Sequence, residues 1–263
     1  RNFIEISDLG KNTFLNNIKG KKNIINFYKR LIDLLIKIQK IKLKKEYVYK
    51  NNIIRFKKFS NSELHKESDL FFDWYLPIFI KKKKIKLIKK NLKSKLEILL
   101  NKLSFENNCF VHRDFHIANI LIDKKKKIGL IDSQDAIIGN PMYDLASLID
   151  DVRVKINKND QSKLYDYYFK KKKFKKIETV KIKNDYDILS VQRNLKILGI
   201  FVRLHKRDDK SGYLKHIPRT WELIIERMKN PIFKDFKNEL EKYLSINVIK
   251  KKAIKWKYKM QWF

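Results

Sequence analysis

One short stretch of the chain combines the residue types that phosphoryl transfer needs. It reads HRDFHIAN and contains Asp114 and Asn119, and a second aspartate, Asp132, follows thirteen positions after the asparagine. In this chemistry one carboxylate accepts the proton of the attacking hydroxyl, while an amide oxygen and another carboxylate hold Mg²⁺ ions that neutralise the phosphates. The spacing therefore predicts Asp114 as a catalytic base and Asn119 and Asp132 as metal ligands.

A predicted β-hairpin explains how these side chains could meet. Two apolar runs, 120–122 and 128–131, flank a turn of lysines at 124–127. This pattern is typical of a hairpin, and a hairpin would bring Asn119 close to Asp132 because each flanks one of the paired strands. A lone HxD motif occurs by chance, and Asp and Asn are common turn formers. The whole constellation is more specific than any of its parts.

At these residues the sequence resembles the aminoglycoside phosphotransferase and choline kinase family, the small-molecule relatives of protein kinases. The family's usual H-G-D-x-x-x-x-N reads HRDFHIAN here, and its I-D-[FW] metal motif reads IDS, with Ser133 in place of the aromatic residue. Within the family, IDSQDAIIGNPMYDLASLIDD is most similar to the anomeric kinases of N-acetylmuramate and N-acetylglucosamine. Three more stretches extend the resemblance over most of the chain: EISDLGKNTFL, ESDLFFDWYLP and QRNLKILGIFVRLHKRDDKSGYLKHIPRT.

The resemblance implies an α+β, mostly α, architecture. It would be the large helical lobe of a protein kinase-like fold, carrying a small catalytic β-hairpin. Residues 1–10 would form the last strand of the small lobe and the hinge, and residues 11–263 the helical phosphotransferase lobe, with the catalytic loop and metal hairpin at 110–135. The chain has no G-x-G-x-x-G motif, and no lysine can be assigned to the ATP-binding role. We therefore expect the N-terminal β lobe to be largely absent.

Cofactor and acceptor contacts are predicted from the same alignment of motifs. By resemblance, the backbone of Ile6, Ser7 and Asp8 would meet the adenine of ATP, and Mg²⁺ would accompany the nucleotide. Side chains beside the motif or in an aromatic, acidic segment are candidates for binding a hydroxylated acceptor. These candidates are Arg113, His116, Gln134, Asp135, Glu67 and Trp74.

Purely structural roles compete with several of these assignments. Arg113 fits a structural ion pair equally well, and His116 fits a solvated loop position. Trp74 and its neighbour Tyr75 fit plain core packing. Asp144 opens a predicted helix and is expected to be structural, as the cap of that helix.

The resemblance implies an ATP-dependent kinase of the anomeric hydroxyl of N-acetylmuramate or N-acetylglucosamine, acting in cell-wall sugar recycling. Another small alcohol is an open alternative as the acceptor: aminoglycoside, choline, homoserine or thiamine. An alternative from a different class is a truncated, inactive remnant that acts as a binding module.

Composition limits the partners. The net charge of +34 would ordinarily indicate nucleic-acid binding. However, the lysines accompany abundant Ile and Asn, whose codons are AT-rich, and they occur in short runs, so we expect no specific nucleic-acid partner. No stretch reaches the roughly 18 apolar residues of a membrane span. Cys109 is the only cysteine, so an intrachain disulfide is impossible. We expect Cys109 to pack in the core, and the absence of disulfides is consistent with a reducing cytoplasm.

Helical periodicity covers much of the remaining chain. The predicted helices are 24–41, 63–79, 85–103, 143–152, 187–205, 221–228 and 233–244. The lysine-rich segment 155–183 is expected to be partly a loop. The basic and aromatic tail 250–263 is expected to dock on the body or to be disordered.

Overall fold

The described part of the chain is mostly helical, which confirms the coarse fold class. A computed structural model describes residues 8–18, 20, 24–44, 46–50, 52–123 and 127–245. The predicted adenine contacts Ile6 and Ser7 and the tail 250–263 lie outside the described residues, whereas Asp8 lies inside them. No helix of the described residues is long and apolar enough to cross a membrane.

Helices of very different lengths make up the framework. They are α1 (Phe14–Ile18), α2 (Ile25–Gln39), α3 (Asn61–Leu70), α4 (Lys82–Leu100), α5 (Met142–Ile149), α6 (Lys158–Lys172), α7 (Thr179–Asp208), α8 (Ile217–Arg227) and α9 (Lys234–Tyr243). A π-helical turn, η1 (Phe71–Tyr75), and a 3-10 turn, η2 (Leu76–Ile78), continue α3. Further 3-10 turns are η3 (Ile117–Asn119), η4 (Lys176–Glu178), η5 (Ser211–His216) and η6 (Pro231–Phe233).

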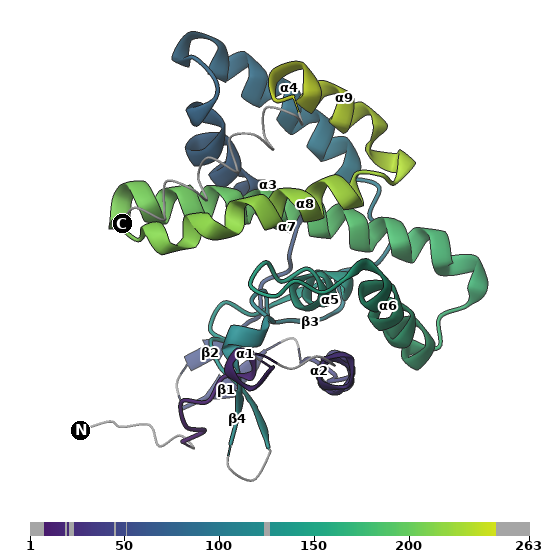
Figure 1. Ribbon diagram of the computed structural model, residues 1–263. Helices are drawn as coiled ribbons and strands as arrows, with labels where there is room; N and C mark the ends of the chain where they lie inside the picture. Colours follow the sequence, from purple (N-terminus) through teal and green to yellow (C-terminus); the bar gives the residue numbers. More distant parts are fainter. Residues whose placement is uncertain are drawn as a thin grey trace.

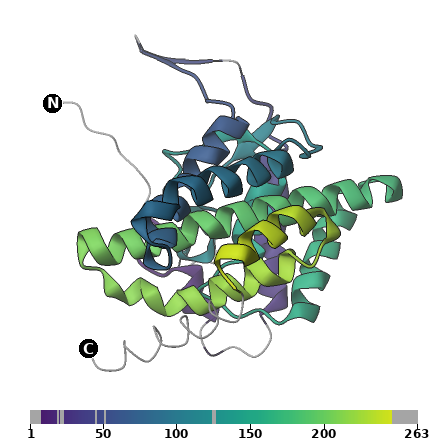
Figure 2. The same cartoon turned by 90° about the horizontal axis from the view of Figure 1, so that it is seen from above.

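Three two-stranded antiparallel sheets complete the described fold. The strands are β1 (Tyr47–Tyr49), β2 (Asn52–Ile54), β3 (Cys109–Val111), β4 (Ile120–Ile122), β5 (Ile128–Leu130) and β6 (Ile137–Gly139). β4 pairs with β5, which confirms the predicted hairpin. β3, which leads into the catalytic motif, pairs with β6, a pairing that local sequence patterns do not predict. The β1–β2 hairpin projects from the body (Figure 2), and its Val48 and Ile53 side chains are exposed.

The 30-residue helix α7 is the central element. It packs against α3, the η1 turn, α5 and α8, and Figure 1 shows it between α4 and α9 on one side and α5, α6 and β3 on the other. A Cβ atom built on Gly199 of α7 would lie 2.2 Å from the backbone carbonyl of Leu70. Only glycine therefore allows α3 and α7 to approach this closely.

The segment 155–183 is partly a loop, as expected, but only at 155–157 and 173–175, and the rest of it is helical. Asn157 caps α6, because its side chain accepts a hydrogen bond from the amide of Asp160 at 2.8 Å. The helix then runs to Lys172, and Lys173 ends it in the left-handed conformation. α7 begins soon afterwards at Thr179, eight residues earlier than the predicted start.

The aromatic segment before Pro77 belongs largely to the core. Tyr75 is almost fully buried, and its hydroxyl accepts a hydrogen bond from the indole nitrogen of Trp221 at 2.7 Å. Trp74 is half-buried and packs against the same hydrophobic core. Cys109 is buried on β3, and burial raises the pKa of its thiol to about 12. The structural alternatives for Tyr75 and Cys109 are confirmed.

Candidate active site

The loop that follows β3 is held by a carboxylate from α5. Asp144 accepts hydrogen bonds from the backbone amides of His112, at 2.7 Å, and Arg113, at 3.0 Å. Its side chain is fully buried, and burial raises its pKa to about 7 although both hydrogen bonds oppose the shift. Asp144 is structural, but the expectation that it caps its own helix is wrong, since no side chain caps the start of α5. Its role is to fix the backbone just before Asp114.

Asp114 lies in a partly buried, positively charged environment. Burial would raise the pKa of its carboxyl, but the charges of Lys196 and Arg193 on α7 outweigh burial and hold the pKa below its usual value. The Asp114 backbone oxygen accepts hydrogen bonds from the His116 amide at 2.8 Å and from Asn119 Nδ2 at 3.2 Å. The loop is thus closed on itself, and the carboxylate is ionised at neutral pH, as a general base must be.

The hairpin brings Asn119 and Asp132 to the same end of its ladder. The Ile131 amide donates to the Asn119 backbone oxygen at 3.0 Å, so Asp132 follows directly after the last rung. Because Asn119 Nδ2 is engaged with Asp114, its Oδ1 atom is the one left to bind a metal. Asp132 is exposed, adopts the left-handed conformation with φ at 68°, and accepts a hydrogen bond from Gln134 Nε2 at 2.6 Å.

This donor set fits a magnesium ion that arrives with a nucleotide. Mg²⁺ prefers oxygen ligands and is usually bound by one or two carboxylates together with substrate phosphates. Asn119 and Asp132 offer an amide oxygen and a carboxylate. Among the described residues no group of three or more His, Cys, Asp and Glu side chains could hold a metal by itself, so the phosphates would have to complete the coordination.

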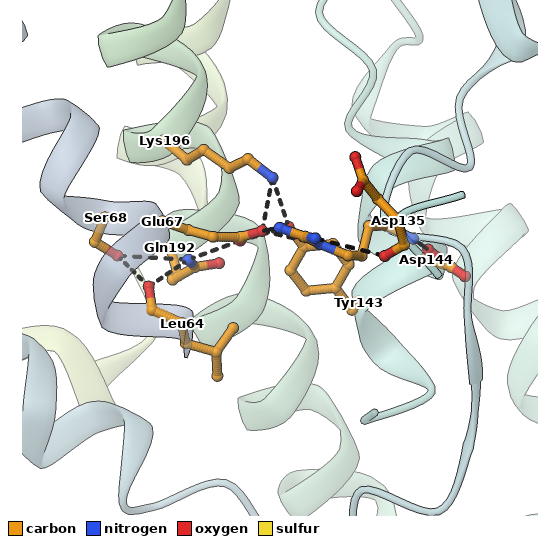
Figure 3. A network of polar contacts seen from close by, with 9 residues as sticks. Leu64, Glu67, Ser68, Asp135, Tyr143, Asp144, Gln192 and Lys196 are labelled. Carbon is orange, nitrogen blue, oxygen red and sulfur yellow. Dashed lines mark hydrogen bonds and ion pairs between the residues drawn. The ribbon is translucent and has the colours of Figure 1, made fainter. Parts of the chain in front are cut away.

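Glu67 of α3 joins the catalytic loop to three helices (Figure 3). Its Oε1 atom lies 2.5 Å from Arg113 Nη2 and 2.7 Å from Lys196 Nζ. Its Oε2 atom accepts hydrogen bonds from the hydroxyl of Tyr143 at 2.8 Å and from Gln192 Nε2 at 3.3 Å. Burial would raise the pKa of Glu67, but the charges of Lys196 and Arg113 hold it below the usual value. We call these five side chains the Glu67 network.

A cavity of about 310 Å³ brings together three of the side chains predicted to bind the acceptor. Arg113, Gln134 and Asp135 line it, and the segment 55–59 forms part of its wall. Glu67, Trp74 and His116 do not line this cavity. Glu67 is instead 7% exposed and occupied by the network.

His116 lies on the catalytic loop immediately before η3. Its ring is buried, and Nδ1 has no hydrogen-bond partner among the described residues. Burial and the nearby charge of Arg153 lower its pKa to about 4, so the ring is neutral at neutral pH. The alternative of a solvated loop position for His116 is therefore wrong.

Sequence reasoning missed the polar side chains of α7 and the end of α5. Gln192 and Lys196 are one helical turn apart and both reach Glu67. Arg193 is buried beside the loop, and Asp151 follows α5. The available signal was the spacing of Gln192 and Lys196, which places both side chains on the same side of the helix.

The chain is similar in sequence to known phosphotransferases. The sequence profile of the phosphotransferase enzyme family matches residues 26–172. The N-acetylmuramate/N-acetylglucosamine kinase of Pseudomonas aeruginosa is 29% identical over 224 residues, which cover 82% of this chain and 62% of that protein. The kinase with the same name from Neisseria meningitidis is 25% identical over 222 residues, covering 82% of this chain and 64% of that protein. A third kinase of that name, from Pseudomonas putida, is 26% identical over 230 residues, which cover 86% of this chain and 65% of that protein. The chain thus spans less than two thirds of the length of these curated relatives.

Proposed function

Because the chain belongs to the phosphotransferase enzyme family, we propose that it acts in an ATP-dependent kinase of the anomeric hydroxyl of N-acetylmuramate or N-acetylglucosamine. The observation that carries the proposal is the arrangement of Asp114, Asn119 and Asp132 around one closed loop and one hairpin. The names of the related kinases support the choice of acceptor. Recycling of cell-wall sugars is the process that this activity would serve.

The proposed fold is the large lobe of a protein kinase-like fold. The described helices and the β4–β5 hairpin support the assignment of residues 11–263 to that lobe, with the catalytic loop and metal hairpin at 110–135. Residues 1–10 would be the last strand of the small lobe and the hinge. Within that segment the described Asp8 forms a turn, because its Oδ1 atom accepts a hydrogen bond from the Gly10 amide at 2.8 Å.

Asp114 is the proposed catalytic base. Its carboxylate would accept the proton of the acceptor hydroxyl while the oxygen attacks the γ-phosphorus of ATP. Asn119 Oδ1 and Asp132 would hold Mg²⁺, which when bound neutralises negative charge on the phosphates. The lowered pKa of Asp114, caused by Lys196 and Arg193 against the effect of burial, keeps the base deprotonated before the acceptor arrives.

Two buried carboxylates act as positioning residues in this proposal. Asp144 holds the backbone of His112 and Arg113, and Glu67 holds the Arg113 side chain. The acceptor would contact Gln134 and Asp135 in the neighbouring cavity. Arg113 lines that cavity as well, although its guanidinium is already paired.

The charge around the base favours this acceptor over the cationic alternatives. Aminoglycosides, choline and thiamine are cations, whereas Lys196 and Arg193 on α7 already make the surroundings of the Asp114 carboxylate positive. A cationic acceptor would be repelled there. A binding module without activity would not need an ionised base and a matched pair of metal ligands.

The partner is thus proposed to be a small sugar and not a nucleic acid. We place the activity in the cytoplasm, where ATP is available and thiols stay reduced. The only cysteine, Cys109, is buried and unpaired, which agrees with such a compartment.

The test is product identification with the full-length protein. We expect ATP and Mg²⁺ to yield a phosphorus-31 NMR signal of an anomeric sugar phosphate from N-acetylmuramate and N-acetylglucosamine. The methyl glycoside of N-acetylglucosamine is the matched control, because its anomeric oxygen is blocked. Phosphorylation of the methyl glycoside, or of neither free sugar, would overturn the proposal.

A further inference from the structure

Among the buried polar atoms around the catalytic loop that have no hydrogen-bond partner within the described residues, three belong to charged or titratable side chains of three different segments. They are His116 Nδ1, Asp151 Oδ2 and Arg193 Nη1, from side chains that are 7%, 1% and 4% exposed. Buried polar groups in folded proteins are nearly always hydrogen-bonded, so each exception needs an explanation. These three unpartnered atoms come from three different segments around the proposed catalytic base. Together they indicate a place where a ligand could supply the missing hydrogen bonds.

Hydrogen-bonded side chains flank Arg193 on both sides along α7. One turn before it, the hydroxyl of Ser190 donates to Asp150 at 2.5 Å, which ties the end of α5 to this face of α7. One turn after it, Lys196 reaches Glu67 in the Glu67 network. Arg193 therefore lies on α7 between the end of α5 and the network that holds the catalytic loop.

The three groups are also electrostatic neighbours. The amide of His116 donates to the backbone oxygen of Asp114 at 2.8 Å, so the imidazole leaves the loop next to the base. Burial is the largest influence on the pKa of His116, and Arg193, Asp151 and Asp114 all contribute to it as well. Arg193 likewise helps to lower the pKa of Asp114. The charges of these groups therefore act on one another around the catalytic loop.

Three cationic side chains act on the catalytic loop: Arg153, Lys196 and Arg193. Among the described residues, Arg193 is the one of these three that has no ion pair. Arg153 is paired with Asp151 at 3.0 Å, and Lys196 with Glu67 at 2.7 Å. No carboxylate of the described residues lies within ion-pair distance of Arg193, although its side chain is almost completely buried. A buried charge without a partner is strongly unfavourable, so the position is suited to an anion that binds and leaves.

We propose that Arg193, Asp151 and His116 form part of the acceptor site, and that the Arg193 guanidinium binds the lactyl carboxylate of N-acetylmuramate. Guanidinium matches a carboxylate in both charge and geometry. Asp151 Oδ2 accepts a hydrogen bond from a sugar hydroxyl, and the neutral His116 ring offers Nδ1 to another. N-acetylglucosamine lacks the lactyl group and gains nothing from Arg193. This inference rests on the proposed function and names the residue that distinguishes its two acceptors.

The test compares Arg193→Gln with wild type on both sugars in the full-length protein. We expect KM for N-acetylmuramate to rise about 10- to 100-fold, the loss expected from one charged hydrogen bond. KM for N-acetylglucosamine should change less than about threefold, within the scatter of such measurements. Arg193→Lys should recover part of the loss. Arg203→Gln is the matched control, since Arg203 lies on the same helix and also has an unpartnered nitrogen, Nε.

Two kinetic outcomes would overturn the inference. An equal loss of kcat for both sugars, with a raised kinetic pKa, would mean that Arg193 only keeps Asp114 ionised. A raised KM for ATP in place of the sugar would mean that Arg193 binds phosphate.

Calorimetric titration with N-acetylmuramate and no nucleotide measures the same contact without turnover. Weaker binding to Arg193→Gln than to wild type, with no phosphorylation by either, would support the subsite and overturn the proposed function. Equal binding to both proteins would overturn the subsite.

Discussion

Arg113 and Glu67 lie 46 positions apart in the chain, yet their side chains form an ion pair with Nη2 only 2.5 Å from Oε1. Arg113 adopts φ of 72°, in the left-handed region that favours glycine, and it occupies the position where the resembled family usually has glycine. Holding an arginine there costs about 1–2 kcal/mol. The partly buried ion pair offsets that strain and fixes the residue immediately before the base.

Arg113→Ala and Arg113→Gly separate the ion pair from the backbone strain. Both changes remove the ion pair, but only glycine relieves the left-handed conformation. We expect the alanine variant to be less stable than the glycine variant by about 1 kcal/mol, after allowing for the greater freedom of glycine in the unfolded chain. Urea unfolding of the two variants measures the difference. A glycine variant that is the less stable of the two would show that strain at Arg113 is unimportant.

Gly199→Ala should separate α3 from α7. The added methyl group would meet the backbone carbonyl of Leu70 at 2.2 Å, and backbone cannot move aside as a side chain can. We expect a loss of about 1–3 kcal/mol in the free energy of unfolding, as for other overpacked interiors. Gly212→Ala is the control, because nothing lies within 4 Å of a Cβ atom there. Equal stability of the two variants would refute the close approach of the helices.

Asp144 should make stability depend on pH. Its pKa in the folded protein is raised by burial to about 7, above the value of about 3.9 in an unfolded chain. The favourable contribution of the protonated form is therefore complete below about pH 4 and is lost as the pH rises through about 7. We expect the free energy of unfolding of wild type to fall relative to that of Asp144→Asn across this window. A pH-independent difference between the two proteins would contradict the raised pKa.

Removing the Asp132 side chain should impair phosphoryl transfer more than removing the Asn119 side chain. Asp132→Ala removes the charged ligand and should abolish phosphoryl transfer, whereas Asn119→Ala should raise the Mg²⁺ concentration needed for half-maximal rate. Both are measured by titrating Mg²⁺ at fixed ATP in the full-length protein. An unchanged Mg²⁺ dependence in Asn119→Ala would remove Asn119 from the metal site.

The sequence predicted those parts of the site that depend on local pattern. The hairpin around 124–127 follows from two short apolar runs and a polar turn, and it brings Asn119 and Asp132 together without help from distant residues. Helix α2 follows from its apolar spacing. In these segments, neighbouring residues determine the structure.

The supporting contacts could not be predicted because they join distant segments. Asp144 was expected to cap its own helix, but the loop 112–113 supplies amides to its carboxylate once β3 pairs with β6. Glu67 and Arg113 were read as separate acceptor contacts, and the structure pairs them with each other. A single sequence does not show which of several charged residues will meet across a packed core.

The assignment of Asp114 as the catalytic base is tested most directly by the rate of phosphoryl transfer in Asp114→Asn, compared with wild type and with Asp123→Asn. Asp123 is the matched control because it is an aspartate of the adjoining β4–β5 hairpin, where its Oδ1 atom only accepts a hydrogen bond from the Lys127 amide at 2.7 Å. General-base assistance contributes about 10²–10⁴-fold, so we expect a loss of that size in Asp114→Asn, an unchanged thermal unfolding curve, and near wild-type turnover in Asp123→Asn. Near wild-type turnover in Asp114→Asn would show that Asp114 is not the base, and the central assignment would be wrong.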